Sequence, residues 1–70
     1  MRIEPGEYEI VVLDCEGFDI HRIVDSPLRI AKERAKRHLN DPEYVTGVGK
    51  VEVRNYNGEC VADYFPENHL

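Results

Sequence analysis

The chain of 70 residues lacks the features on which catalysis, cofactor binding and membrane insertion usually depend. It has no glycine-rich phosphate loop and no G-x-S-x-G motif for a nucleophilic serine. No stretch approaches the roughly 20 apolar residues of a membrane-spanning helix, and residues 1–6 contain no apolar run typical of a signal peptide. We therefore expect a non-enzymatic, cytoplasmic protein with no catalytic residue, no cofactor and no contact with a membrane.

Potential metal ligands are equally few. The chain has two cysteines and three histidines, which allow at most one disulfide and provide no H-x-x-x-H pair. Cys15 and Cys60 are too far apart in sequence for the usual spacing of zinc ligands. We expect Cys60 to point toward the core as a small apolar residue. The sequence thus predicts reduced thiols and no metal site.

The hydrophobic pattern predicts four strands and one helix. The helix begins near Ser26-Pro27, and its apolar stripe contains Ala31 and Ala35, which would allow close packing on a sheet. The predicted strands cover residues 7–14, 18–24, 48–56 and 59–65. This order predicts an α+β fold. It would be a single ββαββ domain over residues 1–70, with a four-stranded antiparallel or mixed sheet and the helix packed on one face.

One dipeptide predicts a strand register. Asn57-Gly58 lies between two predicted strands and favours a two-residue type I′ turn, because both central residues of that turn need positive φ. Such a turn would place Arg54 opposite Val61.

A single helix leaves the second face of the sheet open. Val11 and Leu13 belong to a continuous apolar run and would point to that open face, together with Ile23, Val61 and Phe65. Scattered apolar residues are normal on a surface, whereas a contiguous patch is usually covered by a partner or a second copy. A homodimer through this face is therefore one of the expected partner modes.

Charge is distributed unevenly along the chain. The net charge is −5, yet residues 26–39 carry +4 and the flanking segments are acidic. The outward basic residues of this helix form a candidate nucleic-acid face, since cations on a helix can contact phosphates; they are Arg29, Lys32, Lys36 and Arg37. The alternative is an ordinary solvated face, in which Glu33 pairs with the basic residues four positions before and after it.

The acidic first hairpin is a second candidate contact surface. Glu7, Glu9 and Asp14 would present carboxylates to a basic groove in a protein that handles nucleic acid. Arg54 and Tyr56 join them as candidate partner-binding residues, because arginine and tyrosine often anchor interfaces. The density of carboxylates is also explained by solubility alone.

The layout of the chain resembles small phage-encoded anti-CRISPR proteins. The resemblance rests on PGEYEI at 5–10, a tight hairpin, an alanine-bearing helix after DSP at 25–27, and PEYV at 42–45. It implies a compact inhibitor that occludes a functional surface of a nucleic-acid-handling protein complex, although the basic helix departs from the family pattern. The leading prediction is a non-enzymatic protein-binding module. A nucleic-acid-binding domain and a self-associating structural subunit are the alternatives.

Overall fold

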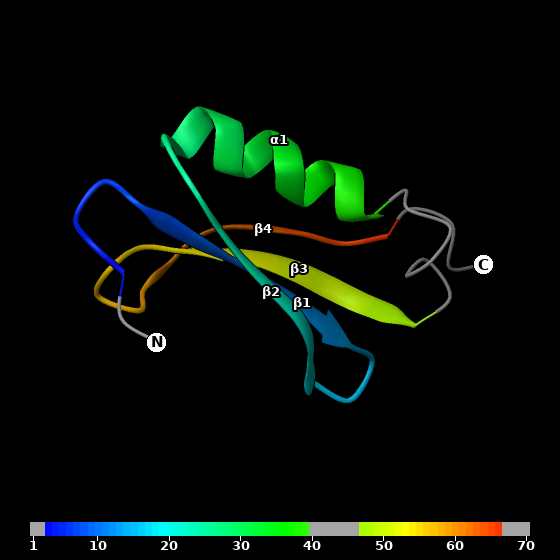
Figure 1. Ribbon diagram of the computed structural model, residues 1–70. Coiled ribbons are helices and arrows are strands. Elements are labelled where there is room, and N and C mark those ends of the chain that lie inside the picture. Colours follow the sequence, from blue (N-terminus) through cyan, green and yellow to red (C-terminus); the bar gives the residue numbers. More distant parts are fainter. Residues whose placement is uncertain (1–2, 40–46, 67–70) are drawn as a thin grey trace.

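The fold is one antiparallel sheet with a single helix across one of its faces (Figure 1). The computed structural model describes residues 3–39 and 47–66. Along the chain the elements are β1 (Tyr8–Asp14), β2 (Asp19–Asp25), α1 (Leu28–Leu39), β3 (Val48–Arg54) and β4 (Cys60–Tyr64). The strands lie in the order β2-β1-β3-β4, and each neighbouring pair is antiparallel. The predicted ββαββ fold is confirmed, and the sheet is antiparallel rather than mixed.

The hydrophobic core lies between α1 and the two central strands. Ile10 on β1 and Val53 on β3 are paired in register, and both are fully buried. Ala31 and Ala35 are the buried residues of α1 and belong to the same cluster. Because their side chains are short, the helix packs closely on the sheet. Among the described residues, no helix has the length and apolar character needed to cross a membrane.

The two hairpins have the same kind of turn. The first turn begins at Asp14, and the second begins 41 residues later, at Asn55. In each turn the side-chain Oδ1 of this first residue accepts hydrogen bonds from the backbone N–H groups two and four residues further on, all at 2.9 Å. The fourth residue of each turn is a glycine with positive φ, 92° in Gly17 and 85° in Gly58. Both hairpins therefore use a three-residue loop that ends in a left-handed glycine.

The predicted two-residue type I′ turn at Asn57-Gly58 is wrong. That turn needs positive φ at both residues, and no described residue other than glycine has positive φ. The side chain of Asn55 lengthens the loop by one residue, because it binds the backbone N–H groups inside the turn.

Each outer strand contains one bulge, at equivalent positions in the two hairpins. Ile20 is the extra residue in β2 and Val61 is the extra residue in β4, and both are exposed. Because the loop is one residue longer than predicted, Arg54 pairs with Cys60 and not with Val61, and the bulge at Val61 then restores the pairing of Val53 with Ala62. Cys60 consequently lies on the same face as Arg54 and is exposed, which contradicts its predicted place in the core. Bulges on edge strands discourage pairing with a further strand.

The predicted apolar patch on the open face does not form. Val11 is fully buried and Leu13 is 7% exposed, although both point away from α1. Ile23 pairs with Ile10 and therefore lies on the helix-covered face. Two members of the predicted patch are exposed, Val61 and Phe65.

Gly49 lets two segments of backbone approach closely. It sits at an irregularity in the pairing of β1 with β3, and a Cβ atom at this position would lie 2.4 Å from the backbone oxygen of Asp14. We expect Gly49→Ala to lower the free energy of unfolding by about 2 kcal/mol, because the backbone it meets cannot move aside cheaply. Urea denaturation followed by circular dichroism measures this change. A loss below about 0.5 kcal/mol, the usual range of surface substitutions, would contradict the close approach.

Asp14 is expected to stabilise the first turn as an acceptor rather than as a charge. Asp14→Asn keeps the Oδ1 acceptor that Asn55 supplies in the second turn, so it should change stability by less than about 0.5 kcal/mol. Asp14→Ala removes the acceptor from two backbone N–H groups and should cost about 1–2 kcal/mol. Equal losses in the two variants, again from urea denaturation, would show that the charge matters instead.

Candidate protein-binding surface

Charged side chains cover the face of the sheet opposite α1. Arg22 on β2 forms ion pairs with Glu9, at 3.1 Å, and with Asp19. In register, Arg22 and Glu52 flank Val11 from the two neighbouring strands. Val11 is therefore buried beneath charged side chains, whose aliphatic parts cover it while their charged groups reach water.

A second group of ion pairs is centred on Glu52. Its carboxylate lies 2.8 Å from Lys50 Nζ and 2.6 Å from an Arg54 guanidinium nitrogen. The hydrogen bond from Lys50 and then that from Arg54 hold the pKa of Glu52 below its usual range, although burial acts in the opposite direction. The same contact raises the pKa of Lys50. The charges on this face are thus largely balanced by one another.

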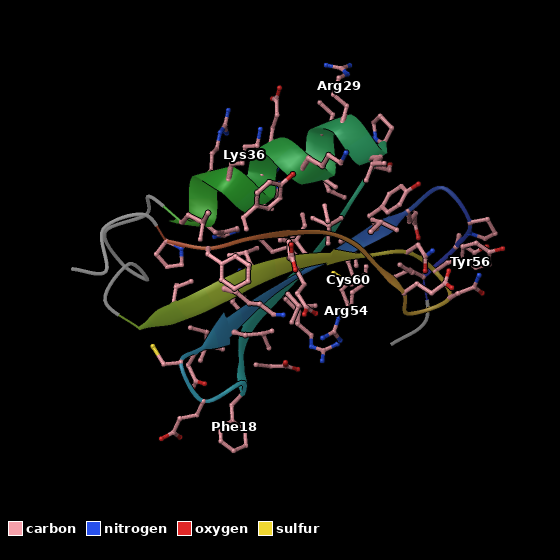
Figure 2. All side chains as sticks on the ribbon, turned by 180° about the vertical axis from the view of Figure 1, so that it is seen from behind. Phe18, Arg29, Lys36, Arg54, Tyr56 and Cys60 are labelled. Atoms are coloured by element: carbon pink, nitrogen blue, oxygen red, sulfur yellow. The ribbon has the colours of Figure 1, made fainter. Side chains whose placement is uncertain are left out.

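Of the residues predicted to bind a partner, Glu9 and Arg54 lie opposite each other on the open face, whereas the others are spread over both ends of the sheet. Glu7 accepts a hydrogen bond from the backbone of the preceding turn, and Glu9 is paired within the sheet. Asp14 holds the turn at the other end of β1, about 20 Å from Glu7 at the usual rise per residue. Arg54 is paired on the open face (Figure 2), and Tyr56 lies half-exposed in the β3–β4 turn. Among these five predicted residues, Tyr56 is the one whose side chain is exposed, and it forms no ion pair.

The outer side of α1 has an excess of positive charge. The helix contains five basic residues and one acidic residue, and three of its basic or histidine residues fall in the last turn. Arg34 is paired with Asp25 of β2 at 2.7 Å. The other basic residues are the predicted nucleic-acid face, and the structure brings them together on one element; they are Arg29, Lys32, Lys36 and Arg37.

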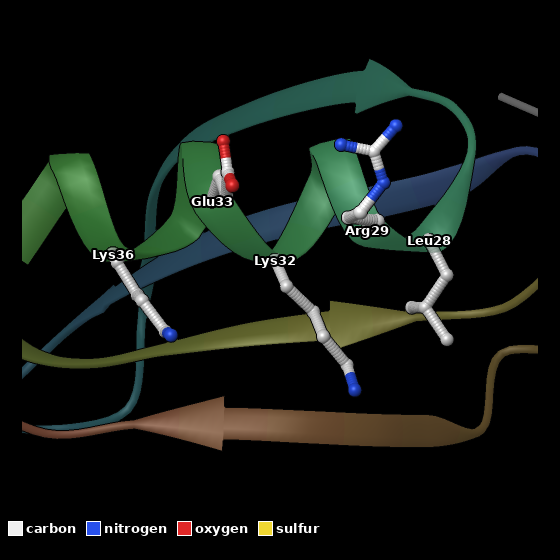
Figure 3. Close-up of a pocket in the computed structure, with 5 residues that line it drawn as sticks. All are labelled: Leu28, Arg29, Lys32, Glu33 and Lys36. Atoms are coloured by element: carbon white, nitrogen blue, oxygen red, sulfur yellow. The ribbon is translucent and has the colours of Figure 1, made fainter.

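An open hollow of about 350 Å³ lies on the surface of α1. It is lined by Leu28, Arg29, Lys32, Glu33 and Lys36. Lys32 and Lys36 follow Leu28 at four-residue spacing and point toward β4 (Figure 3). Lys36 Nζ lies 5.7 Å from the ring centre of Tyr64 on β4. Arg29 and Glu33 line the other side of the hollow. Leu28 is partly buried and packs against the core cluster, as the apolar stripe of the helix predicts, so only part of its side chain borders the hollow.

The predicted ion pairs along α1 do not form. Glu33 has no ion-pair partner among the described residues, so neither Arg29 nor Arg37 is neutralised by it. The carboxylate of Glu33 instead stands exposed between two cations on the same face of the helix.

The histidines supply one ring contact between the helix and the sheet. The rings of His21 on β2 and His38 on α1 have their centres 5.4 Å apart and are tilted by 60°. In residues 3–39 and 47–66, no group of three or more possible metal ligands comes together. His69 lies outside the described residues. The His21–His38 contact thus belongs to the packing of α1 on β2.

Compared with protein family models, curated proteins and solved structures, the chain gives no match. Its function has to be inferred from its surfaces. The two sheet edges carry bulges, and the charges of the open face are paired. α1 contains five basic residues and one acidic residue, and Arg29, Lys32 and Arg37 form no ion pair within the described residues.

The ion pairs of Glu52 predict a specific dependence of stability on pH. Because its folded pKa is lowered from an ordinary value near 4.5, its contribution is fully present above about pH 4.5 and is lost as the pH falls through the folded pKa. We expect the free energy of unfolding of the wild type, minus that of Glu52→Gln, to be constant above about pH 5 and to shrink toward pH 3.

Urea denaturation at several pH values measures this difference. Glu16→Gln is the matched control, because Glu16 is exposed in the β1–β2 turn and makes no ion pair within the described residues. A wild type that loses stability in parallel with Glu52→Gln on acidification would contradict the prediction.

Proposed function

We propose that this protein is a non-enzymatic protein-binding module that binds an acidic partner through the exposed side of α1. The observation that carries the proposal is the group of basic side chains on this element, which the only acidic residue of the helix does not neutralise. Electrostatic complementarity of this kind speeds association and selects the partner. The contact surface is therefore the helix, and not the acidic first hairpin that the sequence favoured.

The other surfaces of the sheet support a partner less well. A peptide added as a strand would have to pair with β2 or β4, and the bulge in each strand works against this. A second copy on the open face would meet a neutralised ionic surface whose aliphatic residues Val11 and Leu13 are already buried. Neither strand addition nor a two-fold homodimer is favoured by these features.

A protein partner fits α1 better than nucleic acid does. Glu33 stands in the middle of the basic face, where it would repel phosphates but can pair with a cation of a protein partner. The net charge of −5 also opposes general attraction to nucleic acid. The resemblance to phage inhibitors makes steric occlusion of a functional surface the mechanism that we propose.

The proposal is tested by comparing two anionic probes of equal charge. A fluorescein-labelled glutamate-rich peptide and a labelled oligo-dT are titrated with the protein at low salt and followed by anisotropy. We expect saturable binding of the peptide, and Lys32→Gln/Arg37→Gln should weaken it about tenfold or more, since both cations lie on the contact surface.

Lys50→Gln/Arg22→Gln is the control, because it removes the same charge from the opposite face of the sheet. It should weaken binding about twofold or less, since distant exposed charges are largely screened. Tighter binding of oligo-dT than of the peptide would overturn the proposal in favour of a nucleic-acid-binding domain. Equal effects of the two double variants would show that α1 is not the contact surface.

A further inference from the structure

The outer row of α1 carries an acidic residue between two basic residues. Glu33 is the one acidic residue of the helix, and Arg29 and Arg37 lie four positions before and after it. Residues four apart lie on the same side of a helix, about 6 Å apart along its axis. Arg29 and Glu33 point away from β4 (Figure 3), and all three side chains are exposed. The outer row therefore presents its charges in the order positive, negative, positive.

The packing of the helix does not account for an acidic residue at position 33. Within residues 3–39 and 47–66, Glu33 forms no ion pair, whereas Arg34 beside it is paired with Asp25 at 2.7 Å. A carboxylate stabilises a helix when it lies in the first turn, close to the positive end of the helix dipole. The first turn of α1 contains no acidic residue, and Glu33 lies in the middle of the helix. Its carboxylate is thus available to a group outside the chain.

We propose that the partner presents a cation flanked by carboxylates to the outer row of α1, and that Glu33 selects this order of charges. This inference rests on the proposed function and names the charge pattern of the acidic partner. The carboxylates of the partner would lie against Arg29 and Arg37. A lysine or arginine between them would lie against Glu33. Glu33 is then the residue that determines specificity, while the basic residues of α1 supply the general attraction.

Charge complementarity along the outer row carries this inference. A partner that is acidic throughout would bring a carboxylate against Glu33, and a basic partner would meet Arg29 and Arg37. Charges about 6 Å apart lie within the Debye length of about 10 Å at 0.1 M salt, so neighbouring positions of the row act on the same partner group. A wrong order of charges is therefore rejected by repulsion as well as by a lost attraction. Lys36 already lies over the ring of Tyr64, and this arrangement makes no use of it.

Two fluorescein-labelled peptides of identical composition test the inference. Both carry glutamates and a single lysine at alternate positions, with serine between the charged residues. The lysine lies in the middle of the first peptide and at the end of the second, so the two peptides differ only in the order of their charges. Alternate side chains of an extended chain lie about 6.6 Å apart, which reproduces the spacing along the outer row. Dissociation constants are measured by fluorescence anisotropy at low salt.

We expect the wild type to bind the first peptide about fivefold more tightly than the second, which is the upper end of what one exposed ion pair contributes. Glu33→Gln should remove this preference. It should also bind the second peptide more tightly than the wild type does, because a carboxylate of that peptide no longer meets Glu33. Glutamine has a helix propensity close to that of glutamate, so far-UV circular dichroism should show an unchanged helix content.

Glu16→Gln is the matched control. Glu16 is exposed in the β1–β2 turn and forms no ion pair within the described residues, so this variant removes the same charge away from α1. It should keep the preference of the wild type for the first peptide. A preference that persists in Glu33→Gln, or one that Glu16→Gln loses to the same extent, would overturn the inference.

Failure of the inference and failure of the proposed function give different results. If the wild type binds both peptides equally and Lys32→Gln/Arg37→Gln weakens both, α1 binds acidic chains without reading the order of their charges. The inference is then overturned and the proposed function stands. If neither peptide binds, or if this double variant changes nothing, the proposed function fails as well.

Discussion

The burial of β1 on both faces is the constraint on which the rest of the structure depends. Ile10 and Val12 are covered by α1, but the chain has no second helix in its described part to cover Val11 and Leu13. Charged side chains on the neighbouring strands cover these two residues instead. Ion pairs hold the charged side chains in place, although each pair alone contributes little to stability. Burial of aliphatic surface, and not the ion pairs themselves, is the main stabilising term.

This arrangement determines which charges are available to a partner. The arginines and lysine on the open face are occupied by carboxylates of their own sheet, so its net charge in contact with water is small. On α1, Arg34 is paired with Asp25 of β2, whereas Arg29, Lys32 and Arg37 form no ion pair within the described residues. The charge separation that is visible in the sequence is therefore sharpened by folding. Glu9, Asp19 and Asp25 of the acidic hairpin are paired with arginines, and those three basic residues of the helix are not paired within the described residues.

The sequence predicted the elements of this fold because their periodicity is local. The apolar stripe with Ala31 and Ala35 identifies the helix, and β-branched runs identify the strands. The pairing next to the second turn was not predictable from Asn57-Gly58, because the side chain of Asn55 decides the length of the loop, whereas beyond the bulge Val53 pairs with Ala62 as a two-residue turn would place it. The ion pairs of Arg22 depend on the pairing of β1 with β2, which no sequence motif specified. The loop length therefore explains why Cys60 was misplaced, and the unpredicted pairing of β1 with β2 explains why the ion pair of Glu9 was missed.

The repeated hairpin turn agrees with the proposed binding through α1 rather than through a sheet edge. Both turns and both bulges recur at equivalent positions, so the two edges of the sheet are protected in the same way. The helix has no counterpart in this repeat, because it is the connection between the two hairpins. A partner that binds α1 leaves the sheet and its ion pairs unchanged. Recognition then requires the ordering of a few lysine and arginine side chains, while the backbone that carries them is already in place.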